Sequence, residues 1–309
     1  MSRGHAEHDH DSHHGHGGHH HAAPDNWRFL VGMGLNGAFV LIEGLAGVAA
    51  HSTALLADAG HNLSDVLSLA LAGGAAWLGR RTATSSHRTY GFAKASILAA
   101  LLNALILVFA CGAIVIEVLH RLATPEPVKL GLMMIVAAVG VAINGATALL
   151  FMAGRKSDVN VRAAFLHMTT DAGVSAGVIA AGGLIVLTGV LWIDPAVSLL
   201  IVAVVLVGTW SLLKESIDLA LDSAPRAIDV EEVRAFIQGC PGVTGVHDLH
   251  VWALSTTETA MTAHIVRPDG GGDAFLNATR AALADRFGLA HATLQVECRD
   301  LSACDELHA

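Results

Sequence analysis

Charged residues are scarce in this sequence. Asp, Glu, Lys and Arg make up 15% of its 309 residues, against 53% hydrophobic residues. With a mean hydropathy of +0.55, the chain is too apolar for a soluble domain and is predicted to cross a bilayer several times. A basic stripe is also lacking. The formal net charge of −9 is spread along the chain, which argues against nucleic acid as a partner.

Cysteine is scarce as well, and two common signatures are missing. The four cysteines form no CxxC pair and indicate no disulfide framework. The HExxH motif, whose glutamate is the general base of many metalloproteases, occurs nowhere. The first 26 residues are polar, so they are not a cleavable signal peptide. The first apolar segment is therefore expected to act as the uncleaved insertion signal.

Six apolar segments follow the polar start. They lie near residues 28–49, 54–78, 96–119, 129–153, 161–190 and 194–213, and each is long enough to span a bilayer as a helix. Lys and Arg cluster after the second and fourth segments, at Arg80, Arg81, Arg88, Lys94, Arg155, Lys156 and Arg162. The loops after the first and fifth have neither. The positive-inside rule thus predicts six spans with both termini in the cytoplasm, as in a bacterial inner or plasma membrane.

Two pairs of ionisable residues recur inside these segments. His61 and Asp65 lie four residues apart in the second segment, and His167 and Asp171 repeat that spacing in the fifth. Residues four apart share one helix face, and an Asp at the bilayer centre costs roughly 2.5–3.5 kcal/mol on insertion scales. A single pair is compatible with a structural hydrogen bond, but two copies favour a binding site. Brought together, two imidazoles and two carboxylates supply the ligands of a tetrahedral Zn²⁺ site.

Other polar residues of the segments can be explained by roles in helix structure. Asp58 lies one turn before His61 and is expected to complement the positive end of its helix, with a place on an exit path as the alternative. Glu43 is either an ordinary buried group or a waypoint for protons or cations. Asp194 stands directly before a proline, as at many helix starts.

Small residues are frequent in the same segments. Gly173 and Gly177 form a small-xxx-small pair directly after Asp171, and such pairs let helix backbones approach closely. General helix packing in the membrane explains these glycines without a specific role at the site. Close packing would still bring the two ligand-bearing segments together.

The two ends of the chain differ from its middle. Residues 1–26 hold nine histidines within the first 21 residues and are predicted to form a disordered tail that captures metal loosely. Residues 27–213 form the predicted transmembrane domain. Residues 214–309 read as a small α+β domain in the order αββαβ, with strands at 246–254, 259–266 and 292–298. In the first strand, Val246 is expected to share a face with Asp248, His250 and Trp252.

Several ordered motifs resemble the cation diffusion facilitator family. They are STALLADAGHNLSD at residues 52–65, YGF at 90–92, HMTTD at 167–171, DP at 194–195 and VHDLHVW at 246–252. The resemblance covers roughly residues 27–300. It implies a homodimeric metal/proton antiporter with six spans and a cytoplasmic domain of ferredoxin-like, metallochaperone-like fold. A His/Asp pair on both ligand-bearing spans resembles the zinc-transporting branch of the family.

The resemblance also implies residues in the cytoplasmic domain. His247, His264 and Glu297 match positions that bind zinc in some relatives, which would make Zn²⁺ a regulatory ligand as well as the transported ion. Ordinary exposed or core histidines are the alternative. His250, His291, Cys298 and Cys304 are further candidate ligands. Lys94 and Asp222 resemble positions that pair between the spans and the cytoplasmic domain in relatives.

These observations leave a transporter as the favoured function. It would export Zn²⁺ from the cytoplasm in exchange for H⁺, or a broader set of cations including Cd²⁺ and Co²⁺. An enzyme is disfavoured because HExxH is absent and because four protein ligands leave no position for a catalytic water. A membrane metal sensor would explain the cytoplasmic domain but not the two intramembrane pairs.

Overall fold

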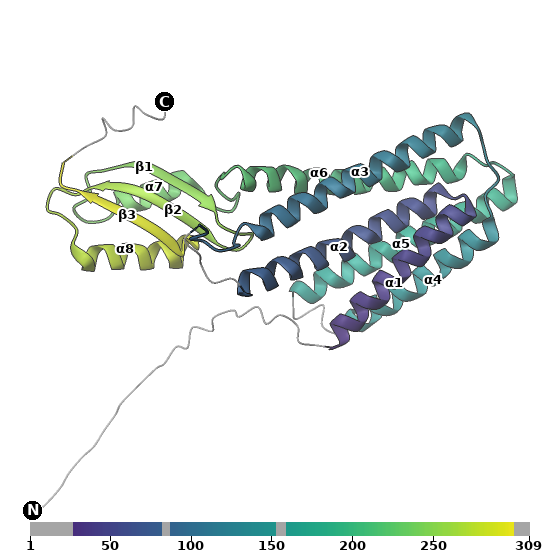
Figure 1. The fold of residues 1–309 in the computed structure, drawn as a ribbon, viewed down its shortest axis with the longest axis horizontal. Helices are drawn as coiled ribbons and strands as arrows, with labels where there is room; N and C mark the ends of the chain where they lie inside the picture. Colours follow the sequence, from purple (N-terminus) through teal and green to yellow (C-terminus); the bar gives the residue numbers. More distant parts are fainter. Residues whose placement is uncertain (1–26, 82–86, 153–158, 300–309) are drawn as a thin grey trace, which may run out of the picture.

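The computed structural model describes residues 27–81, 87–152 and 159–299. Six long helices form an elongated bundle, and a small α/β domain follows at one end of it (Figure 1). The helices are α1 (Trp27–Ala50), α2 (Thr53–Arg81), α3 (Ala95–Ala123), α4 (Leu130–Met152), α5 (Val159–Thr188) and α6 (Ile193–Ala220). The histidine-rich tail predicted at residues 1–26 lies outside the described residues. Helix α6 continues to Ala220, past the boundary predicted at residue 213.

Four of these helices meet the length and hydropathy of a membrane span. They are Ala95–Ala123, Leu130–Leu149, Phe165–Thr188 and Ile193–Ala220, and Asn36–Ala50 is a shorter apolar helix. Large apolar side chains such as Phe109, Leu187 and Val207 point outward and are 76–83% exposed, as expected where lipid covers a helix. Helix α2 is less apolar because it carries Asp58, His61 and Asp65. Its 29 residues still extend about 44 Å.

The bundle packs around an apolar centre. Phe39, Leu55, Met133, Val178 and Ile201 contribute to it from five different helices. The glycines that permit close packing are not the predicted ones, because a Cβ at Gly173 or Gly177 would meet no described atom within 4 Å. The crowded positions lie elsewhere in the bundle. A Cβ at Gly140 would come within 2.9 Å of Ser175 Oγ, and one at Gly182 within 2.7 Å of Met134.

The start of α2 is fixed by a carboxylate from another helix. Asp194 lies in the first turn of α6, as predicted, and is fully buried. It accepts hydrogen bonds from the hydroxyls of Ser52 and Thr53, at 2.5 and 2.7 Å, and from the backbone N–H groups of Thr53 and Ala54. A negative charge at a helix N-terminus is favourable. Asp194 therefore anchors the ligand-bearing helix α2 to α6, a contact that the sequence did not reveal.

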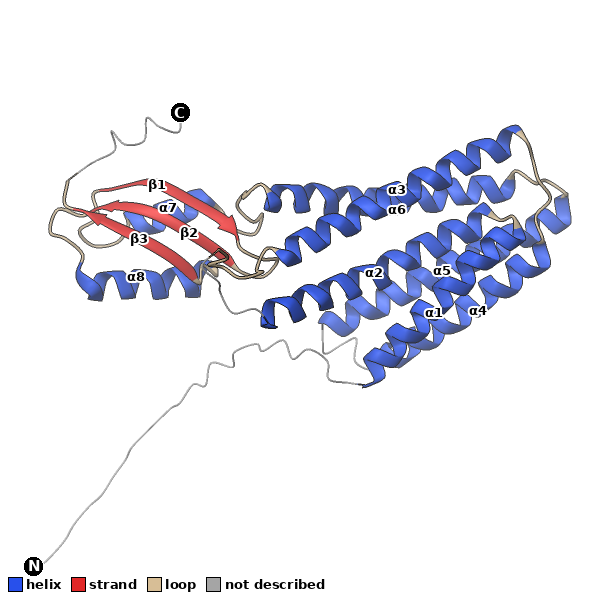
Figure 2. Ribbon diagram, viewed as in Figure 1, coloured by secondary structure: helices blue, strands red, loops and turns tan. Residues whose placement is uncertain are grey.

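The C-terminal domain is a three-stranded sheet with two helices (Figure 2). Its elements are α7 (Val230–Gln238), β1 (Gly245–Ala253), β2 (Thr259–Val266), α8 (Gly272–Phe287) and β3 (His291–Glu297). Strand β1 pairs with β2 antiparallel, and β2 pairs with β3 in parallel. The core joins the helices to the sheet through Val233, Ile237, Met261, Ile265 and Leu283. The described chain thus consists of a bundle of long helices followed by a small domain with a three-stranded sheet.

A bulge in β1 corrects one prediction. The pairing register shifts between His247 and His250, and Asp248 adopts a positive φ of 48°. An extra residue in a strand resets the alternation of its faces. Val246 is consequently buried together with Leu249 and Val251, so the prediction that it shares a face with His250 is wrong.

Polar and aromatic contacts join the C-terminal domain to the bundle in the described part of the chain. Lys94 Nζ lies 2.5 Å from Asp222 Oδ1, which confirms the pair expected from the resemblance. The backbone N–H of Thr256 donates to Ser96 Oγ at 3.1 Å. The rings of Tyr90 and His291 meet edge to face at 5.6 Å. All three contacts on the bundle side come from the segment at or just before the start of α3.

Candidate metal centre

The two His/Asp pairs meet between α2 and α5. His61 Nε2 lies 3.3 Å from Asp171 Oδ1, and His167 Nε2 lies 3.2 Å from Asp65 Oδ2 and 3.7 Å from Asp171 Oδ2. One ligand atom each from His61, Asp65 and Asp171 falls within 4.8 Å of the others. All four predicted residues are therefore brought to one place.

The pairing across the helices follows from their direction. Helices α2 and α5 pack against each other, and three reversals of the chain between them make them antiparallel. The first member of one pair then faces the second member of the other, so each imidazole meets a carboxylate of the opposite helix. The two rings lie edge to face with centroids 6.3 Å apart.

These distances fit a single tetrahedral ion. Zn²⁺ binds nitrogen and oxygen at about 2.0–2.2 Å, which places neighbouring ligand atoms of a tetrahedron about 3.3–3.4 Å apart. The two cross-helix contacts, at 3.2 and 3.3 Å, have that length. The contact within α5, between His167 and Asp171, is longer at 3.7 Å. Two nitrogens and two oxygens also match the donor types that borderline divalent cations prefer.

The cluster is closed on one side and open on the other. The side chain of Asp171 is 1% exposed, whereas that of His167 is 41% exposed. His61 and Asp65 have intermediate values of 23% and 26%. Asp171 thus lies at the buried end of the cluster and His167 at its more exposed end.

A second cluster lies on the C-terminal sheet. Glu297 Oε2 lies 3.0 Å from His247 Nε2, and Glu297 Oε1 lies 3.0 Å from His264 Nδ1. His247 and His264 are cross-strand partners on β1 and β2, with ring centroids 5.1 Å apart. These are the three residues that the resemblance indicates, and one ligand atom of each falls within 4.8 Å of the others.

The carboxylate of this cluster is held in its ionised form. Burial alone would raise the pKa of Glu297, but hydrogen bonds from His247 and Gln295 and the charge of the two imidazoles outweigh burial. The pKa of Glu297 therefore lies below its usual value. Metal ligands must be deprotonated before they bind, so the group is ready to bind a cation at neutral pH.

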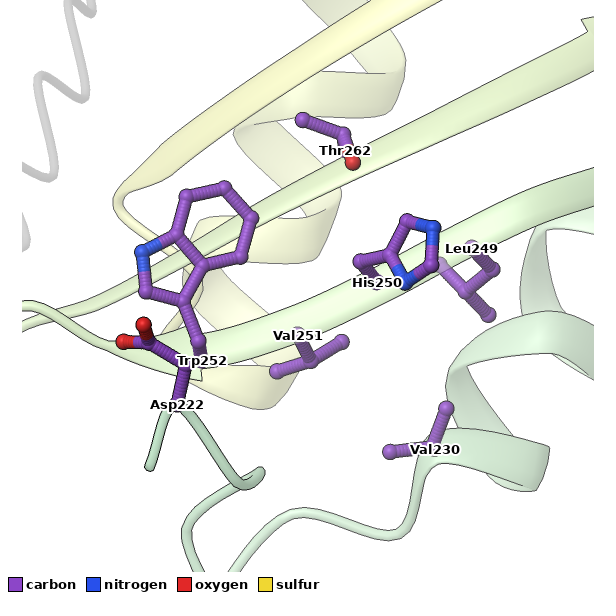
Figure 3. A pocket seen from close by; sticks show the side chains of 7 residues that line it. All are labelled: Asp222, Val230, Leu249, His250, Val251, Trp252 and Thr262. Atoms are coloured by element: carbon purple, nitrogen blue, oxygen red, sulfur yellow. The ribbon is translucent and has the colours of Figure 1, made fainter. Parts of the chain in front are cut away.

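The other candidate ligands are not part of this trio, although Asp248 lies between His250 and His264, 3.5 Å from His264 Nε2. His250 bonds Asp248 at 2.7 Å, beyond the bulge, and His291 is exposed against Tyr90. Cys298 is exposed, and Cys304 lies outside the described residues. His250 borders a cavity of about 540 Å³ beside β1, together with Asp222, Val230, Leu249, Val251, Trp252 and Thr262 (Figure 3). Trp252 and Asp222 lie next to each other at one end of this cavity (Figure 3), and Asp222 also pairs with Lys94 of the bundle.

Known proteins resemble both parts of the chain. Residues 29–219 match the family model of the cation efflux transmembrane domain, and residues 225–298 match that of the cation efflux protein cytoplasmic domain. The metal cation efflux system protein CzcD of Cupriavidus metallidurans is 36% identical over 296 residues, covering 94% of this chain and 92% of that protein.

Two further relatives align over similar lengths. The zinc transporter ZitB of Escherichia coli is 38% identical over 273 residues, which is 87% of each chain. The cadmium, cobalt and zinc/H(+)-K(+) antiporter of Bacillus velezensis is 33% identical over 286 residues, covering 90% of this chain and 91% of that protein. With both domains matched in order, the chain is a cation efflux transporter rather than an enzyme, and it belongs to the cation diffusion facilitator family.

Proposed function

We propose that the protein exports Zn²⁺ from the cytoplasm in exchange for H⁺ by alternating access. The observation that carries this proposal is the four-residue cluster of His61, Asp65, His167 and Asp171, with cross-helix distances of 3.2 and 3.3 Å. Its ligands come from two separate helices, so a relative movement of α2 and α5 can open the site to either side or change its geometry.

The donor set supports zinc as the main substrate. Two imidazoles and two carboxylates suit a borderline d¹⁰ ion without a strong geometric preference of its own. Relatives named as zinc transporters support the same choice. A broader range that includes Cd²⁺ and Co²⁺ is the second candidate, because one relative is named for cadmium, cobalt and zinc. A metal sensor would use only the cluster of the C-terminal domain and would leave the intramembrane ligands without a role.

The same donor set supports exchange with protons. Metal needs neutral imidazoles and ionised carboxylates, so protons and metal compete for the same atoms. An unperturbed histidine titrates near pH 6.5, where a modest pH gradient acts. Protonation on the acidic outer side would release the metal, and cytoplasmic metal would displace the protons. No separate proton channel is then needed.

The membrane arrangement belongs to the proposal. In the proposed arrangement, each of the six helices α1–α6 crosses the membrane, and both termini lie in the cytoplasm of a bacterial-type cell. The Lys and Arg residues of the loops after α2 and α4 favour that orientation. Two copies associate as a homodimer, and the cluster of His247, His264 and Glu297 acts as a regulatory metal site facing the cytoplasm.

Reconstitution into liposomes tests the proposal. Purified protein is supplied with Zn²⁺, Cd²⁺, Co²⁺ and Mn²⁺ in turn, and metal uptake is followed together with an entrapped pH dye. We expect Zn²⁺ to move fastest and to be accompanied by protons in the opposite direction. Metal binding without any flux would indicate a sensor, and equal rates for all four metals would reject the selectivity.

A further inference from the structure

Two buried carboxyl groups lie next to the metal centre but outside it. Glu43 on α1 and Asp58 on α2 are both completely buried. Asp58 and Asn62 lie four residues apart and share one face of α2. Asn62 bonds Glu43, so the two carboxyl groups lie on the same side of α2. Two carboxylates buried together without a positive partner are very costly, so we expect the pair to hold a cation, in its simplest form one proton.

The hydrogen bonds that the structure describes for the pair come from neutral side chains. Asn62 Nδ2 donates to Glu43 Oε2 at 3.0 Å, and Ser175 Oγ donates to Asp58 Oδ2 at 2.8 Å. Within the part of the chain that the structure describes, Glu43 Oε1 and Asp58 Oδ1 receive no N–H or O–H donor.

Helix α4 packs beside Ser175. A Cβ at Gly140 would come within 2.9 Å of Ser175 Oγ, so this helix packs directly against the hydroxyl that bonds Asp58. Of the titratable groups, Asp171 faces both members of the pair, and His61 faces Asp58. Charged groups buried without partners are very costly, so two carboxylates in this place require a bound cation.

The position of the pair gives it a role. Asp58 lies one turn from His61 along α2, and Ser175 lies one turn from Asp171 along α5. On both helices the step leads toward the end of the bundle that is remote from the C-terminal domain (Figure 1). If that domain faces the cytoplasm, Asp58 lies about one helical turn beyond the four ligands in the direction of export.

We propose that Glu43 and Asp58 form a second cation site, which takes the transported divalent ion from the four-ligand centre on its way out. Between transport events the pair holds one proton, and the arriving ion displaces that proton to water. The site offers oxygen donors without imidazole, so it binds zinc more weakly than the four-ligand centre and favours onward release. This inference rests on the export direction of the proposed function.

Neutral substitutions test the site. Glu43→Gln and Asp58→Asn keep size and hydrogen bonding but remove the acidic groups, and Glu117→Gln on α3 makes the same type of change outside the cluster. We expect zinc affinity of the purified protein to stay within about threefold of wild type in all three variants, because the four ligands are intact. Zinc transport in liposomes should fall by about tenfold or more in Glu43→Gln and Asp58→Asn, but not in Glu117→Gln.

Two results would overturn the inference. If Glu43→Gln and Asp58→Asn transported zinc at the rate of the control Glu117→Gln, the ion would not pass through the pair. A parallel loss of zinc affinity and transport would show that the pair only supports the four-ligand centre. Failure of the proposed exchange is separable from both, because wild-type zinc flux without proton flux rejects antiport whatever the two variants do.

Infrared difference spectroscopy tests the bound proton directly. Adding Zn²⁺ to metal-free wild type should reduce the carbonyl band of a protonated carboxyl group, and this signal should be lost in Glu43→Gln. Histidines of the N-terminal tail do not contribute to that band. An unchanged zinc-dependent signal in Glu43→Gln would show that the proton is held elsewhere.

Discussion

The two ligand clusters use the same types of donor in different mechanical settings. The centre between α2 and α5 takes its ligands from two helices, and its side chains range from 1% to 41% exposed. The cluster of the C-terminal domain takes its ligands from three strands of one sheet, where backbone pairing fixes His247 opposite His264. A sheet ladder holds ligands in one geometry, whereas two packed helices can shift relative to each other.

This difference separates their expected roles. A transport site must bind on one side and release on the other, so its ligands need to move apart or change exposure. A regulatory site needs a stable geometry that reports the cytoplasmic metal concentration. The intramembrane centre should therefore decide whether transport occurs, and the sheet cluster should only adjust at which concentration it occurs.

Removing one intramembrane carboxylate should have the largest effect. Asp171→Ala, or Asp65→Ala, deletes a ligand and a negative charge, and we expect zinc transport to fall by at least about 100-fold. The variant should still insert and dimerise, as measured by membrane extraction and size-exclusion chromatography. Asp285→Ala, an exposed change on α8, serves as the control. Wild-type transport by either ligand variant would reject the site.

Exchanging both imidazoles should change selectivity rather than abolish binding. His61→Asp combined with His167→Asp gives an all-carboxylate cage, which suits harder cations. We expect the ratio of Zn²⁺ to Mn²⁺ transport to drop by about tenfold or more. A metal panel in liposomes measures that ratio. If the ratio stays the same, residues other than these ligands select the ion.

Disabling the sheet cluster should have a moderate effect. His264→Ala removes one of the two imidazoles that contact Glu297, and we expect the zinc concentration for half-maximal transport to rise by about two- to fivefold. The maximal rate should be retained. His120→Ala, an exposed histidine at the end of α3, is the matched control. If His264→Ala lowered the maximal rate as much as Asp171→Ala does, both clusters would be essential for transport. The distinction between a transport site and a regulatory site would then be wrong.

Deleting the N-terminal tail should have the smallest effect. A chain without residues 2–22 lacks nine histidines but keeps both clusters. A chelating tail raises the local metal concentration without building either site, so we expect at most a shift in apparent affinity. Transport over a range of zinc concentrations measures this shift. Complete loss of transport in a well-expressed deletion variant would contradict the expectation.

The sequence predicted the elements and the intramembrane cluster better than the contacts between elements. The repeated spacing of His61–Asp65 and His167–Asp171 is a local pattern, because residues four apart share a helix face wherever they occur. Apolar runs likewise predicted where the helices lie. The C-terminal trio became visible only through the family resemblance, since its residues are distant in sequence and carry no common spacing.

Contacts set by tertiary packing escaped prediction. Asp194 was interpreted as part of the start of its own helix, yet its carboxylate fixes the start of α2. Ser175 had no signal at all, because a serine gains a role only when α5 packs beside Asp58. The bulge at Asp248 escapes prediction because residues 246–254 fit a regular alternation of faces. The extra residue is visible only in the pairing with the neighbouring strand.

The coupling of metal to protons is the most direct test of the proposed mechanism. Zinc is supplied to liposomes on the side of the C-terminal domain, and the pH of the opposite compartment is followed with an entrapped dye. The account predicts that protons move against zinc, that an opposing proton gradient accelerates zinc movement, and that Asp171→Ala abolishes both fluxes together. Zinc flux that is insensitive to the gradient and moves no protons would contradict exchange at His61, Asp65, His167 and Asp171.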